Sequence, residues 1–271
     1  MRTALLASFL LGATALPAQD REFGVAVPTT LTQMRSEPEA YKSVKVQFTV
    51  QFASLGRIAN PFFTKFTPSD FANFYGWADE QPIWQQSAYD DVFGMLFLSK
   101  SHPKLDQLYS LKLYQRIRIT GVVRNTFQGA PWIEVVDFEG VEGQLDTALL
   151  THLYRGERHM EQRQWQRAMA ELAMVQGKNV PPPALRAAHK SLGLCLLRQG
   201  EAPLAISYLK SAEAMSTARD TELDTMLAVA QAQPEQAIDR TVDARSLKDS
   251  ERPMWEAFDG DRTVRPSKSM R

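Results

Sequence analysis

The sequence predicts an α+β protein whose first half is rich in strands and whose second half is helical. Three observations carry this prediction. Polar and apolar residues alternate strictly over residues 45–52, which is the period of a half-buried strand. Two further alternating runs, 116–123 and 132–136, flank a segment containing glycine and proline, as in a hairpin. From Leu149 onward, the apolar residues recur with the period of helices.

The first residues are typical of a secretory signal peptide. Arg2 precedes an apolar run over residues 4–15, and small residues follow it. We therefore expect a signal peptide at 1–18, cleaved after Ala15 or Ala18. An uncleaved anchor is the alternative, although the run is shorter than the about 20 residues that span a bilayer. The mature protein is expected to be periplasmic or extracellular, with no membrane span after cleavage.

Composition limits the classes of partner. Hydrophobic residues make up 44% of the chain and charged residues 23%, as in ordinary globular proteins. The 31 basic and 31 acidic residues give a net charge of zero, without the basic surplus typical of nucleic-acid binding. Nucleic acid is therefore not an expected partner. The single cysteine, Cys195, lies within the helical pattern and is expected to be a small buried apolar residue.

The first domain is expected over residues 20–145. Besides the three runs above, residues 92–98 have the composition of a strand. Between the first strand and the hairpin lies a long segment, 57–112. Within it, Thr67-Pro68-Ser69-Asp70 offers an N-cap and a proline at the first helical position, which predicts a helix start. Ser101-His102-Pro103 predicts another short helix.

The order of these strands resembles that of OB-fold modules of bacterial proteins. The resemblance rests on the runs YKSVKVQFTV, YQRIRITGVV and GAPWIEVVDFEGVE, and it covers about residues 40–143. It implies an OB-like β-barrel into which the segment 57–112 is inserted, with at least one helix. The length of that insertion departs from the usual pattern.

The second domain is expected over residues 149–240 and resembles a tetratricopeptide (TPR) repeat protein. In that pattern the small residues mark where two helices cross, and a glycine makes the turn between them. The matching residues are Leu192, Gly193, Leu196, Gly200, Ala205, Leu209 and Ala212.

A degenerate copy of this pattern lies 37 residues upstream, at Gly156, Trp165, Ala168 and Leu172. Three prolines at 181–183 mark the lengthened connection between the copies. A further helix over Thr221–Gln233 is expected to act as a cap, with a last turn at 235–240 and a polar mobile tail over 241–271. Because two repeats and a cap are marginal alone, we expect them to pack against the β-domain.

The TPR resemblance implies that the first helix of each repeat lines a concave face that grips a protein or peptide. The leading expectation is therefore an exported, non-catalytic adaptor. The alternative is that these helices only buttress the β-domain. The residues implied on the better repeat are Lys190, Leu194, Leu197 and Arg198, and those on the weaker repeat include Glu157 and Glu161.

An aromatic-rich window supports a second hypothesis, a module that binds a glycan or an oligonucleotide. Eleven of the chain's 26 aromatic residues lie within residues 62–97, together with one lysine and five acids. Most of these rings are expected to build a core. If they bound a ligand instead, the rings would be solvent-facing and coplanar. The candidate ligand-binding residues are Trp77, Trp84, Trp132, Arg116 and Arg118.

A third hypothesis is an enzyme acting on envelope sugars, which needs two carboxylates facing each other across one cleft. Paired carboxylates such as Asp79-Glu80 and Asp90-Asp91 could do such acid/base work, but adjacent acids are mostly solvated loop residues. His152 and His159 are seven residues apart on an expected helix and could hold a metal, but two separate surface histidines are the favoured interpretation. No catalytic residue, metal or cofactor is therefore expected. Oligomeric state and partner identity are left open.

Overall fold

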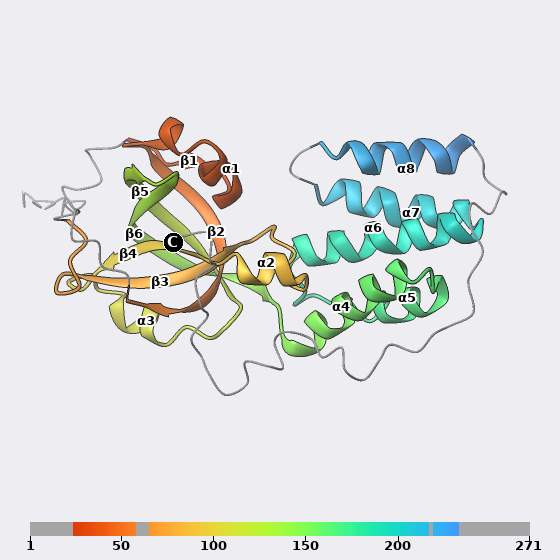
Figure 1. The fold of residues 1–271 in the computed structure, drawn as a ribbon, viewed down its shortest axis with the longest axis horizontal. Helices are drawn as coiled ribbons and strands as arrows, with labels where there is room; N and C mark the ends of the chain where they lie inside the picture. Colours follow the sequence, from red (N-terminus) through yellow and green to blue (C-terminus); the bar gives the residue numbers. More distant parts are fainter. Residues whose placement is uncertain (1–23, 58–64, 217–218, 233–271) are drawn as a thin grey trace, which may run out of the picture.

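The computed structural model describes residues 24–57, 65–216 and 219–232 and has a mixed six-stranded sheet followed by packed helices (Figure 1). The protein is therefore α+β, as predicted. The expected signal peptide, the turn at 235–240 and the polar tail lie outside the described residues.

The sheet consists of β1 (Val27–Pro28), β2 (Lys45–Gly56), β3 (Phe71–Ala78), β4 (Phe93–Ser99), β5 (Gln115–Phe127) and β6 (Ala130–Gln144). Hydrogen-bonded neighbours follow the order β1-β2-β3-β4-β6-β5, and β2 also pairs with β5. The pairing therefore runs in a cycle through β2, β3, β4, β6 and β5. The pairs β1–β2 and β4–β6 are parallel, and the others are antiparallel.

Four predicted strands are confirmed as β2, β4, β5 and β6, but the predicted helix start at 67–70 is wrong. Those residues form a turn in which the N–H groups of Asp70 and Phe71 donate to the carbonyl of Thr67. The same side chains favour turns as well as N-caps, so the local signal does not separate the two. The strand β3 that follows is buried at seven of its eight positions, so it has no polar–apolar alternation.

The β5–β6 hairpin turns at Gln128 and Gly129, whose φ angles are 52° and 73°. Both values are positive, as in the two-residue turns whose twist matches that of the flanking strands. Gly129 adopts this conformation without steric cost, whereas Gln128 is one of the few described residues with a side chain at positive φ. The hairpin predicted between the runs 116–123 and 132–136 is therefore confirmed.

Short helices cover the core of the strand cycle from two sides. Helix α1 (Leu31–Ser36) begins with a Thr30 capping box and contributes Leu31 and Met34, both fully buried. Helix α3 (Leu105–Tyr109) follows the 101–103 segment, as predicted, and contributes buried Leu108. All three side chains join a core that includes Phe48, Phe74, Leu96, Ile117 and Ile133. A short 3₁₀ helix, η2 (Pro38–Tyr41), connects α1 to β2.

The second half of the described chain is helical, as predicted. It contains α4 (Thr147–Glu161), α5 (Trp165–Leu172), α6 (Pro182–Gln199), α7 (Ala202–Ala214) and α8 (Thr221–Ala232), each packed against the next (Figure 1). The Asp146 side chain caps α4 by accepting from the N–H of Leu149. Gly200, at φ 83°, ends α6 in the left-handed conformation that glycine allows.

Two helix pairs make the same close contact. A Cβ built at Gly156 of α4 would lie 2.7 Å from Leu172 of α5, and one built at Gly193 of α6 would lie 2.5 Å from Leu209 of α7. In both pairs only a glycine lets the second helix approach so closely.

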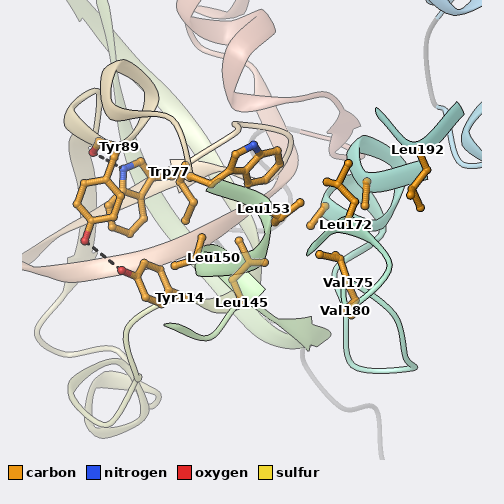
Figure 2. Packing of buried hydrophobic residues seen from close by; sticks show 14 of the residues in the cluster. Trp77, Tyr89, Tyr114, Leu145, Leu150, Leu153, Leu172, Val175, Val180 and Leu192 are labelled. Atoms are coloured by element: carbon orange, nitrogen blue, oxygen red, sulfur yellow. Dashed lines mark hydrogen bonds between the residues drawn. The ribbon is translucent and has the colours of Figure 1, made fainter. Parts of the chain in front are cut away.

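The two halves share one hydrophobic core. It joins Trp77, Tyr89 and Tyr114 of the strand-rich half to Leu150, Leu153 and other helical residues (Figure 2). Within it, the Trp77 indole donates to the Tyr89 carbonyl at 2.9 Å. The Tyr89 and Tyr114 hydroxyls lie 3.0 Å apart. Helix α2 (Gln86–Asp90), in the β3–β4 connection, supplies Tyr89 at this junction. The helices therefore pack against the strand-rich half, as expected for a short array.

Candidate functional site

Some of the helical residues expected to bind a partner instead contact other residues of the same chain. Lys190 of α6 forms ion pairs with Asp220 at 2.8 Å and Glu222 at 2.7 Å, at the start of α8. Arg186 also pairs with Asp220, at 2.5 Å. Lys190 therefore attaches α8 to α6 in this structure.

Asp220 is the centre of this cluster. One of its carboxylate oxygens accepts the N–H groups of Glu222 and Leu223 and thereby caps α8. Burial acts against its ionisation, but the hydrogen bonds from Lys190, Leu223 and Arg186 lower the pKa of Asp220 to about 2. The carboxylate is thus ionised at neutral pH.

The other three α6 candidates differ in their exposure. Leu197 is 4% exposed and belongs to the core that α6, α7 and α8 share. Leu194 is half-buried against that core, and Arg198 is half-buried in the last turn of α6. Among the four α6 candidates, Leu194 and Arg198 keep part of their surface exposed in the described part of the chain, although Leu194 also packs against the core.

On α4, the candidate Glu157 holds the β3–β4 connection. The Trp84 indole donates to its Oε1 at 2.6 Å, and the Gln85 amide donates to both carboxylate oxygens at 3.0 Å. Burial raises the pKa of Glu157, and these hydrogen bonds oppose that rise. Glu157 is therefore a contact between the two halves, whereas Glu161 is exposed and pairs with Arg158 at 2.7 Å.

The three tryptophans proposed to face a ligand are buried: Trp77 is 0% exposed, Trp84 4% and Trp132 2%. Trp132 does lie parallel to Phe97, with ring centroids 5.2 Å apart and planes at 12°, and Phe66 stacks on Phe97 at 4.3 Å. This stack is itself covered, because Phe66 is 2% exposed. The criterion of solvent-facing rings is not met.

The two arginines proposed as ligand contacts make ion pairs within the chain. Arg116 is 6% exposed and binds both oxygens of Asp79, at 2.6 and 2.7 Å. It also donates to the carbonyl of Glu142. Arg118 pairs across the hairpin with Glu139 at 2.9 Å. Because Arg116 is buried and paired with Asp79, its role in this structure is to join β5 to the β3–β4 connection.

The two carboxylates of each acidic pair have different surroundings, because the side chains of adjacent residues usually point in different directions. Asp79 pairs with Arg116, and Asp90 accepts a hydrogen bond from Gln86 at 2.8 Å. The second member of each pair, Glu80 and Asp91, lines one cavity near α1. No spacing in the sequence predicts that one member of each pair would line the same cavity.

Histidine and cysteine side chains have separate structural partners. His152 pairs with Glu171 at 2.8 Å, while the neighbouring candidate His159 is buried and bonds to Gln164 at 2.7 Å. Cys195 is buried, which raises its thiol pKa to about 12. Within residues 24–57, 65–216 and 219–232, no cluster of three or more histidine, cysteine or acidic side chains could hold a metal ion.

No described helix is both long and apolar enough to cross a membrane. Comparison of the chain with protein-family models, curated proteins and solved structures finds no match.

Proposed function

We propose that this chain is an exported, non-catalytic adaptor that binds a protein or peptide segment on a short TPR-like helical array. The observation that carries this proposal is the repeated glycine–leucine contact. Gly156 against Leu172 and Gly193 against Leu209 are the same contact, 37 residues apart. A repeat of a whole helix pair is the building principle of solenoid proteins, whose stacked units create extended binding surfaces.

Two further features fit a TPR-like array. Helix α8 packs on α7 and also contacts α6, as expected for a terminal capping helix. Its inner side is apolar, with Leu223, Met226, Leu227 and Ala230 buried. The array lacks a third helix pair within the described residues, and its packing against the strand-rich half supplies the burial that a further repeat would give.

The strand-rich half is proposed to be an OB-like barrel. Its cycle of five strands closes on itself through the β2–β5 pairing, and an OB fold is a five-stranded Greek-key barrel. A helix, α3, lies between β4 and β5 and covers the core.

The partner surface is proposed to lie on α6 rather than on α4. On α4 the inner face is already in contact with Trp84 and Gln85 of the β3–β4 connection through Glu157. On α6 the equivalent position, 37 residues on, is Leu194, which keeps part of its surface. We call Leu194 and Arg198 the α6 surface. An apolar side chain beside a cation suits a segment with an aliphatic and an acidic residue.

The other hypotheses receive less support. A glycan or oligonucleotide platform built on Trp77, Trp84 and Trp132 would need rings that solvent can reach, and these are buried. Both oxygens of Asp91 are held by Arg35, so Asp91 is not a free general base beside Glu80. Buttressing of the β-domain by the helices is compatible with the shared core and is the direct competitor of the adaptor proposal.

Site-specific photo-cross-linking distinguishes an adaptor role of the helices from a buttressing role. A photoreactive phenylalanine analogue is placed at Arg198, and at Leu204 in a control protein. Leu204 is 56% exposed and lies on α7, so it samples a different helix. An adaptor would give one defined adduct at position 198 that is absent at position 204.

The partner identified from that adduct would then be purified and tested against the Arg198→Glu variant. Because this change reverses the charge at position 198, an acidic partner residue would meet repulsion, and the binding should weaken about tenfold or more. Equal cross-linking at both positions, or unchanged affinity of the variant, would leave the helices with a buttressing role only.

A further inference from the structure

A cavity of about 730 Å³ lies beside α1, where three distant segments of the chain meet. They are α1, the β3–β4 connection and the β5–β6 turn. The volume falls within the range of about 300–1,000 Å³ typical of small-molecule sites. We call it the α1 cavity. From its lining we infer that it binds a neutral saccharide, a conclusion that does not depend on the adaptor proposal.

Ion pairs and hydrogen bonds within the chain hold the walls of the α1 cavity together. Arg35 of α1 binds both oxygens of Asp91, at 2.9 and 2.7 Å, with its guanidinium 5.8 Å above the centre of the Phe93 ring. Gln81 holds the β3–β4 connection by donating to the carbonyls of Ala88 and Asp91, at 2.7 and 2.9 Å. A preformed site loses little conformational entropy on binding.

Several polar groups around the α1 cavity remain available. Among the described residues, the hydroxyls of Thr32 and Ser87, the Gln128 amide and the Glu80 carboxylate have neither a hydrogen bond nor an ion pair. Hydroxyl and amide groups both donate and accept, whereas a carboxylate only accepts. Sugar hydroxyls also do both, so this mixture suits a polyhydroxylated ligand.

The charged side chains that line the α1 cavity disfavour an anionic ligand. The α1 cavity contains one cation, Arg35, and two carboxylates, Glu80 and Asp91. Because Arg35 is already paired with Asp91, no free cation among these lining residues offsets Glu80. A phosphorylated or carboxylated ligand would meet repulsion there, and the polar rim does not suit an apolar one. A neutral saccharide avoids both costs.

The test is an NMR titration of the isotope-labelled protein with maltose, cellobiose and N,N′-diacetylchitobiose, with glucose 6-phosphate as the anionic comparison. At least one neutral sugar should shift amide signals of residues 32–36, 80–91 and 128–130. The Glu80→Ala variant should raise the dissociation constant about tenfold or more, since hydrogen bonds to charged groups are strong. Glu213→Ala, an exposed change on α7, is the matched control and should leave it unchanged.

Three results would overturn the inference. The first is the absence of shifts with every neutral sugar up to about 10 mM, which is tenfold above a weak dissociation constant of about 1 mM. The second is a set of shifts confined to residues outside the α1 cavity. The third is tighter binding of glucose 6-phosphate than of the neutral sugars. Glu80 is exposed and unpaired, so its replacement is not expected to unfold the protein, which the unchanged remainder of the spectrum would verify.

Discussion

The contact between Gly193 and Leu209 gives the sharpest test of how the helix pairs pack. A methyl group added at Gly193 would lie 2.5 Å from Leu209 Cδ2 and 2.6 Å from its Cγ, well inside van der Waals contact. Leu209 is completely buried, so it cannot move aside freely. Overpacking of this kind costs about 1–3 kcal/mol. The higher helix propensity of alanine stabilises the helix by about 1 kcal/mol relative to glycine and partly offsets this cost. Gly193→Ala should therefore destabilise the protein by about 1 kcal/mol.

The same substitution should change sign once Leu209 is shortened. Leu209→Ala alone should cost about 2–5 kcal/mol because it leaves a cavity. With that space open, the methyl at position 193 no longer clashes, and its propensity gain of about 1 kcal/mol remains. The expected coupling between the two changes is thus about 2 kcal/mol.

Urea unfolding of the four proteins, followed by circular dichroism, measures this coupling as a double-mutant cycle. Additivity of the two changes within about 0.5 kcal/mol would refute the close contact. The Gly156 and Leu172 pair, with its 2.7 Å approach, is a second cycle that should behave alike if both helix pairs pack in the same way.

Three other predictions concern titratable groups. Asp220→Ala should destabilise the protein by about 1–3 kcal/mol at neutral pH through loss of the α8 cap and its ion pairs. Because its pKa is about 2 when folded against 3.8 ordinarily, this difference should shrink as pH falls from about 4 to about 2 in thermal melts. Glu157 has a raised pKa when folded, so its ionisation opposes folding. Wild-type stability should therefore gain a contribution as pH falls toward 4.5 that Glu157→Gln lacks in urea titrations, and identical pH profiles would contradict this. Native Cys195 should not react with a thiol reagent near neutral pH but should react fully in denaturant, and rapid native reaction would contradict its burial.

The sequence pattern predicts those strands and helices that bury only one face, because their polar and apolar residues then recur with a regular period. Residues 45–52 alternate because one face of β2 packs on the core while the other is more exposed. The helices from α4 to α8 were predictable for the same reason, since each buries one stripe. Gly200 was predictable as a helix end because its left-handed φ is a property of one residue.

The pattern failed where both faces of an element are covered. Strand β3 is buried on nearly every residue, so no period appears in its sequence, and the preceding turn residues read equally well as a helix cap. The two-residue strand β1 and the short helices α1 and α2 also passed unpredicted. Elements of two to six residues contain too few positions for a period to emerge.

The aromatic window shows what composition can and cannot decide. Its excess of acids over lysine argues against nucleic acid as a ligand, and its many aromatic rings predict a core. Whether Trp77, Trp84 and Trp132 face solvent depends on which segments cover them, and this is a property of the whole fold. Tyr89 covers Trp77 from 12 residues away in the sequence. Phe66 stacks on Phe97 from 31 residues away, in the same stack as Trp132.

By itself, the sequence determined the α+β class, the order of strand-rich and helical halves, the spacing of the helix pairs and the lack of a basic surplus, because these are local or additive properties. Only the tertiary structure decided which charged and polar side chains are free. Arg116 meets Asp79 from 37 residues away, and Trp84 meets Glu157 from 73. Such pairs depend on how distant elements dock, so no spacing in the sequence predicts them. The same docking leaves Leu194 and Arg198 accessible on α6 and brings Glu80 and Asp91 to one cavity.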